Sequence, residues 1–234
     1  MDTQTRRALK QDKFAQATAS SMSWLSLHRA GALRWGIGAA VVILLIVGGV
    51  VSYNYESSAS ETALGAALDA YNAPLALPGA PPEKGTYATA NDRSKAANQL
   101  FLATAQKYGW LSAGTKAHYF AGITDGDLGQ NAAAESELKT AAGSWNRNIA
   151  NLAKVALAGL YHRTNRDAQA IDLYNEVVAK PSVTVPVTVA QLDLADLYAA
   201  SGKQDQARAL WAKVKDSDKE GAAGSIATQK LAGK

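Results

Sequence analysis

The sequence predicts an all-α protein, with one N-terminal transmembrane helix followed by an α-solenoid of about three to four helix pairs. One uncharged apolar run occupies residues 35–53, which is long enough to cross a bilayer as a helix. The rest of the chain is rich in alanine, with apolar residues at the i, i+3, i+4 and i+7 spacing of amphipathic helices. A set of small and aromatic residues also recurs after 36 and then 37 residues, which is typical of stacked helical repeats.

The composition excludes several classes of site. The 234-residue chain has no cysteine and only three histidines. Disulfides, thiolate zinc sites, iron–sulfur clusters and cysteine nucleophiles are therefore ruled out. His118 and His162 belong to no HxxxH or HExxH pattern, and the chain has no GxSxG motif and no Gly-rich phosphate loop after a strand. We predict that the protein is not an enzyme and has no catalytic residue, no cofactor and no metal site.

Residues 1–34 are predicted to form a basic cytoplasmic tail. The net charge of the chain is +4; residues 1–35 hold six basic and two acidic side chains, whereas the remaining residues hold 18 of each. A nucleic-acid-binding protein needs a basic face on its folded part, so this distribution argues against nucleic acid as a partner. The tail is weakly apolar around Trp24, which fits either a short helix lying on the bilayer or an unstructured tail.

Residues 35–55 are predicted to form the transmembrane helix. The 19 uncharged residues 35–53 span roughly 28 Å as a helix. Trp35 and Tyr53 stand at its ends, where amphipathic aromatic residues prefer the headgroup region. Arg29 and Arg34 precede the run, and no Lys or Arg follows it before Lys84. The positive-inside rule then predicts an inner-membrane protein with a cytoplasmic N-terminus and a periplasmic, or otherwise extracytoplasmic, C-terminal domain.

Two other interpretations of the apolar run were weighed. The small residues at 57–60 are of the kind found near signal-peptide cleavage sites, but the run is longer than a usual signal core and a long segment precedes it. A buried core helix would need apolar segments to surround it, and no other segment of the chain is apolar enough. An uncleaved anchor is the preferred interpretation.

Residues 56–90 are predicted to hold a membrane-proximal helix and a Pro-rich loop. The helix would cover about 57–73, either separate from the transmembrane helix or continuous with it. Residues 74–90 contain four of the six prolines, which indicates a loop that is either mobile or a binding element. A helix over 91–108 follows the loop.

The repeat predicts three helix pairs, at about 114–143, 149–179 and 187–215, within a repeat domain of residues 91–218. A weak helix at 219–232, in the C-terminal segment 219–234, would cap the open end of the array. The recurring residues are Ala158, Tyr161, Asn165, Ala170, Tyr174 and Val177, then Ala195, Tyr198, Gly202, Ala207, Trp211 and Val214, with Gly122, Gly129, Ala134, Leu138 and Ala141 as a weaker first copy.

Each class of repeated residue has a physical reason. Small residues such as Ala158 and Ala195 are expected where the two helices of a pair cross, because a larger side chain would push them apart. Gly129, Asn165 and Gly202 are expected at the turns between helices, where the backbone must be left-handed and Gly or Asn tolerates this.

This pattern resembles the tetratricopeptide repeat, an α-solenoid that serves as a protein-interaction scaffold. A single span followed by a small exported solenoid further resembles the ancillary subunit family of the bacterial Sec (SecYEG) translocon, whose members are single-pass inner-membrane proteins with periplasmic tetratricopeptide repeats. The resemblance implies contact with the translocon and with periplasmic chaperones. It covers the layout of residues 30–218 and the repeat positions.

A binding surface follows from the same resemblance, because the first helix of each tetratricopeptide pair lines the concave surface. The residues expected there are Lys116, Tyr119, Ile123, Leu152, Val155, Gly159, His162, Leu192 and Asp196. Some tetratricopeptide domains carry a set of basic residues on this surface that binds acidic peptides. Here the equivalent places hold Val155, Gly159, Leu192 and Asp196, so that basic set is absent. The surface is therefore expected to bind an extended apolar segment with little dependence on salt. In the competing interpretation, Leu152 and Val155 pack in the core.

Two classes of function remain. The first is a membrane-anchored protein–protein interaction scaffold in the cell envelope that assists protein translocation or recruits periplasmic chaperones. The second is a structural subunit of an envelope machine, for cell division or outer-membrane assembly, that docks fixed partners. Both imply protein partners and contact with the lipid bilayer through one span, with no nucleic acid and no small-molecule substrate.

Overall fold

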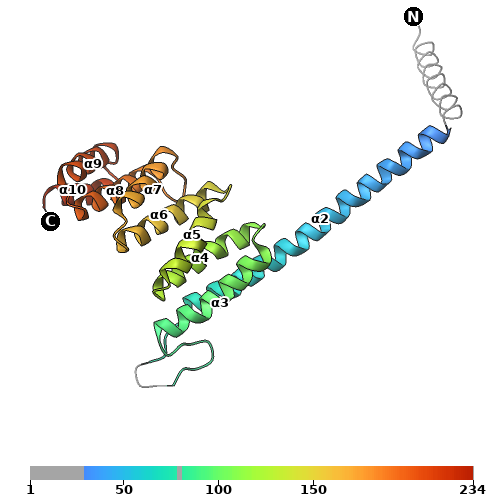
Figure 1. Cartoon of the computed structure of the whole chain (residues 1–234), viewed down its shortest axis with the longest axis horizontal. Coiled ribbons are helices and arrows are strands. Elements are labelled where there is room, and N and C mark those ends of the chain that lie inside the picture. The colour runs from blue at the N-terminus through green and yellow to red at the C-terminus, as the bar shows by residue number, and fades with distance from the viewer. Residues whose placement is uncertain (1–28, 78–80, 234) are drawn as a thin grey trace, which may run out of the picture. The chain divides into compact units, whose positions relative to one another are not determined.

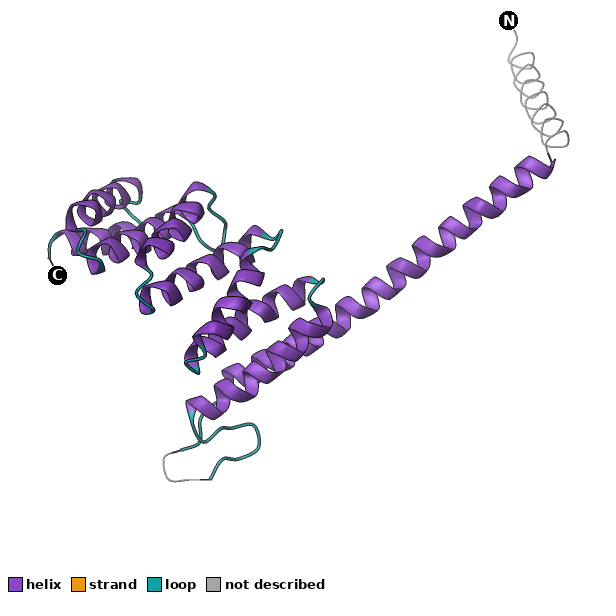
Figure 2. Ribbon diagram, viewed as in Figure 1, coloured by secondary structure: helices purple, strands orange, loops and turns teal. Residues whose placement is uncertain are grey.

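The computed structural model describes residues 29–77 and 81–233, and these residues form nine helices. The predicted basic tail and its alternative interfacial helix fall largely in residues 1–28, outside the described residues. The prediction of an all-α fold, with a long apolar helix followed by packed helix pairs, is confirmed (Figures 1 and 2). The helices are α2 (Arg29–Asn72), α3 (Ala90–Tyr108), α4 (Ser112–Asp127), α5 (Asn131–Ala142), α6 (Arg147–Arg163), α7 (Asp167–Ala179), α8 (Val187–Ala200), α9 (Gln204–Ser217) and α10 (Ala222–Leu231).

The first helix, α2, is 44 residues long and is shared by two compact units of the chain. Unit 1 ends at Tyr55 and unit 2 begins at Glu56. The apolar part of α2 is exposed, and it is long and apolar enough to cross a membrane. A membrane anchor and a signal sequence both meet this criterion. The helix runs without interruption through residues 57–73 as far as Asn72, so the continuous alternative is correct.

Unit 2 begins with the last part of α2, which packs against α3 and α4. Leu64 and Ala67 of α2 are buried with Ala97 and Phe101 of α3. The Phe101 ring stacks on Phe120 of α4, with 5.2 Å between the ring centroids. The N-cap of α3 is Thr89, whose hydroxyl oxygen accepts a hydrogen bond from the backbone N–H of Asp92 at 3.1 Å, and this bond fixes the start of the helix.

Helices α4 to α9 form three pairs that pack in chain order. Each helix contacts the next one, α4 also contacts α6, and α10 covers α9 and α8 (Figure 2). The pairs α4/α5, α6/α7 and α8/α9 coincide closely with the predicted ranges. The structure therefore resembles a repeat solenoid, in which each pair is stabilised mainly by its neighbours.

The turn inside each pair has the same backbone geometry. Gly129, Asn165 and Gly202 have positive φ values of 74°, 59° and 76°. In each case the backbone N–H of the next residue donates a 2.8 Å hydrogen bond to the carbonyl five residues earlier (130 to 125, 166 to 161 and 203 to 198). This is the hydrogen bond of a Schellman helix end. The predicted left-handed turns are confirmed.

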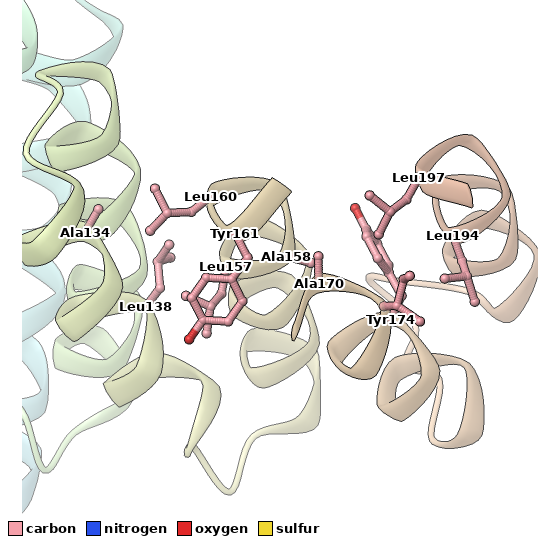
Figure 3. Close-up of a cluster of buried hydrophobic side chains, with 11 residues drawn as sticks. Ala134, Leu138, Leu157, Ala158, Leu160, Tyr161, Ala170, Tyr174, Leu194 and Leu197 are labelled. Carbon is pink, nitrogen blue, oxygen red and sulfur yellow. The ribbon is translucent and has the colours of Figure 1, made fainter. Parts of the chain in front are cut away.

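The main core cluster joins α5, α6, α7 and α8, and its side chains point toward one another in Figure 3. Ala158 and Ala170 are fully buried between Tyr161 and Tyr174. In the first pair, Gly122 takes the place of the crossing alanine. A Cβ atom at Gly122 would lie 2.6 Å from Leu138 Cγ, so α4 and α5 approach more closely than an alanine would allow.

The segment between α2 and α3 is held together at its ends. Leu75 and Tyr87 form an isolated parallel bridge, and the backbone N–H of Ala76 donates to the carbonyl of Tyr87 at 2.8 Å. Residues 78–80 lie outside the described residues. The described part of this Pro-rich segment is therefore a loop closed by main-chain hydrogen bonds.

Candidate functional site

A groove of about 320 Å³ lies where α6, α7 and α8 meet, and we call it the α6–α8 groove. It forms because the fully buried Ala158 leaves room between the helices that a larger side chain would fill. Its lining residues are Ala158, Gly159 and His162 of α6, Tyr174 of α7, and Asp193, Asp196, Leu197 and Ala200 of α8.

His162 stands at the mouth of the groove because α6 ends there. Its Nδ1 lies 2.8 Å from Oδ1 of Asp167, the first residue of α7. The other carboxylate oxygen of Asp167 accepts a hydrogen bond from the Ser201 hydroxyl. The hydrogen bonds from Ser201 and His162 lower the pKa of Asp167. The imidazole is thus positioned by the turn that begins α7.

Asp196 is held in a fixed orientation by two donors. Trp211 Nε1 donates a 3.0 Å hydrogen bond to its Oδ1, and Lys230 of α10 donates a 2.8 Å hydrogen bond to its Oδ2. The lysine also lies 5.9 Å from the centroid of the Trp211 ring. The Asp196 carboxylate is therefore compensated by a positive charge within unit 2.

Asp193 differs from Asp196, because no described residue makes a hydrogen bond or ion pair with its side chain. Burial raises the pKa of Asp193, and the nearby Asp196 raises it further. The pKa of Tyr174 is also raised, mainly by burial and then by the charges of Asp193 and Asp196. The groove therefore favours a positively charged or hydrogen-bond-donating group.

The predicted surface residues on α4 do not line this groove. Lys116 Nζ lies 3.2 Å from Glu61 Oε1 of α2 and forms an ion pair with it. The Tyr119 ring is half-buried against Phe120, with 5.0 Å between the centroids, and burial raises its pKa, with a further contribution from Tyr71. Ile123 is also partly buried.

Three predicted apolar residues take part in the packing of unit 2. Val155 packs against two core clusters, and Leu152 packs against one of them. Leu192 is only 9% exposed and packs with Ala195 and Trp211. Of the predicted set, the α6–α8 groove brings together Gly159, His162 and Asp196.

The sequence reasoning missed Asp193 and Tyr174 as lining residues. Asp193 follows Leu192 directly, so an error of one position on the helix was enough to miss it. Tyr174 is one of the recurring residues of the repeat, and it is buried in α7. With three polar side chains and a tyrosine, the groove is less apolar than predicted.

Ser201, Asp167 and His162 are linked by hydrogen bonds, but in an order that differs from a catalytic triad. Both Ser201 Oγ and His162 Nδ1 bind the Asp167 carboxylate. In a triad the histidine stands between the other two and takes the proton of the serine. Ser201 is therefore not activated as a nucleophile by this arrangement. Within residues 29–77 and 81–233, no group of three or more His, Asp or Glu side chains is placed to hold a metal ion.

No protein-family model matches the chain, and no curated protein has significant sequence similarity to it.

Proposed function

We propose that this chain is a membrane-anchored protein–protein interaction scaffold of the cell envelope, with α2 as its anchor and unit 2 outside the cytoplasm. The observation that carries this proposal is the α6–α8 groove. It is an open hollow between stacked helix pairs, and the half-buried Asp193 in it has no ionic partner among the described residues. A hollow of this size accommodates side chains of a partner polypeptide.

The repeat geometry supports a tetratricopeptide-type scaffold. The left-handed turns at Gly129, Asn165 and Gly202 recur with offsets of 36 and 37 residues, close to the 34-residue tetratricopeptide period. The buried Ala158 and Ala195 stand at the same place in successive pairs. Under this proposal α4, α6 and α8 are the first helices of their pairs, and the groove lies on the surface that such helices present to partners.

The packing around residues 57–60 favours an uncleaved anchor. This segment lies within the uninterrupted α2. Ser60 is buried, and its hydroxyl donates a 2.7 Å hydrogen bond to the Ser57 carbonyl. The segment that would hold a signal-peptide cleavage site is thus used by the fold of unit 2. We infer an inner-membrane protein with its N-terminus in the cytoplasm.

The proposed partners are proteins, in line with the resemblance to the ancillary translocon family: the Sec translocon, a periplasmic chaperone or an exported client. In this role the protein assists translocation or recruits chaperones. The alternative is a structural subunit of a cell-division or outer-membrane assembly complex, in which the same groove docks one fixed partner. We propose no nucleic acid and no small-molecule substrate.

Photo-crosslinking in cells separates these alternatives. A photoreactive residue replaces His162 at the mouth of the groove, and a matched control replaces Asn175, an exposed residue of the neighbouring α7. Many different adducts at position 162 would support a scaffold for clients, and one discrete adduct would support a fixed subunit. If position 162 gives no more adducts than position 175, the groove is not the binding site.

A further inference from the structure

Three connections join one helix of unit 2 to the first helix of the next pair: residues 109–111, 143–146 and 180–186. Two hollows show that these connections lie side by side. A hollow of about 490 Å³ is lined by residues of the first and second connections, and a hollow of about 520 Å³ is lined by residues of the second and third. Asn146 lines both hollows. We call this row of loops the connection edge, and it can be followed in Figure 2.

The connection edge presents large apolar side chains to the solvent. Trp110 is 65% exposed in the first connection, Trp145 is fully exposed in the second and Val183 is 89% exposed in the third. Tryptophan has a large apolar surface with a polar N–H at one side, and proteins place such residues where one side is apolar and the other is wet. One exposed tryptophan needs no explanation, but a row of apolar tips does.

The charge of this edge has a single sign. Residues 107–117, 143–149 and 180–190 include Lys107, Lys116, Arg147 and Lys180, and they contain no Asp or Glu. Lys116 is already paired with Glu61. The opposite edge, formed by the turns 125–131, 163–167 and 201–205, holds three basic and four acidic residues. Of these two edges, the connection edge is the one that complements an anionic surface.

The first connection of the connection edge lies near Glu56, the first residue of unit 2. Arg93 Nη1, at the start of α3, donates a 3.2 Å hydrogen bond to the carbonyl of Ala73, just after the end of α2. The two helices run in opposite directions from there, so the end of α3 and Trp110 lie beside the Glu56 end of α2. The ion pair between Lys116 and Glu61 agrees with this.

We propose that the connection edge binds the anionic surface of a lipid bilayer. Trp110 and Trp145 insert at the headgroup region, and Arg147 and Lys180 contact the phosphates of anionic lipids. This inference rests on the proposed function, because it needs α2 to be a membrane anchor. Since the anchor keeps the edge at a high local concentration at the membrane, weak contacts suffice to hold it there.

Lipid contact can be measured directly, because the chain has no cysteine. The full chain is reconstituted in nanodiscs of phosphatidylcholine and phosphatidylglycerol containing a nitroxide lipid, with an NBD fluorophore on Asn148→Cys. Gln169→Cys, at the start of α7 and beside the opposite edge, is the matched control; both residues are exposed. We expect the nitroxide lipid to quench the fluorophore at 148 and to leave the one at 169 unaffected. Quenching at 148 should be lost in the W110S/W145S variant and weaker in R147Q/K180Q or in pure phosphatidylcholine.

The outcomes separate the inference from the proposed anchor. If the chain stays in the bilayer and the fluorophore at 148 is not quenched, the edge does not touch lipid, although the anchor stands. If the fluorophore is unquenched in nanodiscs but shielded from aqueous iodide in native membranes, the edge is a protein interface and the inference is overturned. If the chain does not remain in the bilayer at all, the proposed anchor fails as well. R147Q/K180Q changes only exposed side chains, so it keeps the test valid if W110S/W145S does not fold.

Discussion

At the scale of residues, small side chains control how closely the helices of a pair approach. Ala158, Ala170, Ala195 and Ala207 are completely buried at their crossings. The two helices of the first pair approach even more closely, because Gly122 has no side chain and Leu138 fills the space beside it. Packing in protein interiors is dense enough for a single methyl group to matter at such a site.

The first prediction is that Gly122→Ala destabilises unit 2. The new methyl group would lie against Leu138 and close to the backbone carbonyl of Ala134. Overpacking costs about 1–3 kcal/mol, and a Cβ atom 2.6 Å from Leu138 Cγ places this site in the upper part of that range, above the roughly 1 kcal/mol gained in helix propensity. Gly65→Ala is the matched control, because nothing lies within 4 Å of a Cβ atom there, and it should stabilise. Urea unfolding of the two full-chain variants, followed by circular dichroism, would contradict this if both shifted in the same direction.

The second prediction concerns the unpaired carboxyl of Asp193. Its pKa is raised in the folded protein, so the folded state binds this proton more tightly than the unfolded state does. Well below pH 4, the Asp193 carboxyl is protonated in both the folded and the unfolded state. As the pH rises above about 4, the unfolded state loses this proton first, so the wild type loses stability relative to Asp193→Asn. The difference should grow by about 1.4 kcal/mol for each unit of pKa shift and then stay constant.

Urea unfolding between pH 3 and pH 7 measures this difference. Asp172→Asn, at an exposed position of α7, should change stability by less than about 0.5 kcal/mol at all these pH values. If Asp193→Asn also reduces the crosslinking at position 162, the charge costs stability and serves binding. A stability difference that does not change with pH would show that Asp193 is well solvated.

At the scale of elements, the sequence predicted the turns better than the faces of the helices. The turns were predictable because only Gly and Asn readily adopt the positive φ found at 129, 165 and 202. Helix α8 (VTVAQLDLADLYAA) is apolar almost all round, so its sequence gives no single outward face. The sequence therefore predicts Leu192 on the binding surface, whereas the structure places Asp193 in the groove. The exposed tips Trp110 and Trp145 were not predictable, because the exposure of a loop residue depends on which loops become neighbours.

The third prediction is that α10 stabilises the end of the array. Ala223 and Ala227 of α10 cover Trp211, which is buried. A chain that ends before Ala222 should expose Trp211 and show faster amide exchange in α8 and α9. Exchange in α4 should stay the same, because α4 packs against α3, α5 and α6 and solenoid repeats depend on their neighbours. Removing only residues 232–234 is the control; equal acceleration in all helices would refute a local capping role.

At the scale of the whole molecule, the apolar part of α2 separates an N-terminal segment with an excess of basic residues from a unit whose charges balance. The positive-inside rule converts this asymmetry into an orientation. The charge distribution and the span could both be read from the sequence. Whether the span is retained depends on processing, which the sequence pattern alone does not decide.

The fourth prediction concerns the membrane topology of the chain. In spheroplasts, a membrane-impermeant maleimide should label Asn131→Cys in unit 2 and leave Ser20→Cys in the tail unlabelled until the membrane is opened. The full-length chain should also resist carbonate extraction, because α2 remains in the bilayer. The natural chain has no cysteine and serves as the blank. A carbonate-soluble form beginning near residue 60 would establish cleavage, and labelling of position 20 in intact spheroplasts would reverse the orientation.

The neighbour-only packing of the helix pairs has a mechanical consequence. Each pair is held mainly by the pair before it and the pair after it, so a pull between the two ends of unit 2 would not be shared by the whole core. The array would yield one pair at a time. Each repeat of 36 or 37 residues would lengthen the chain by roughly 120 Å. Under tension unit 2 would therefore extend in steps and would not open as a single block.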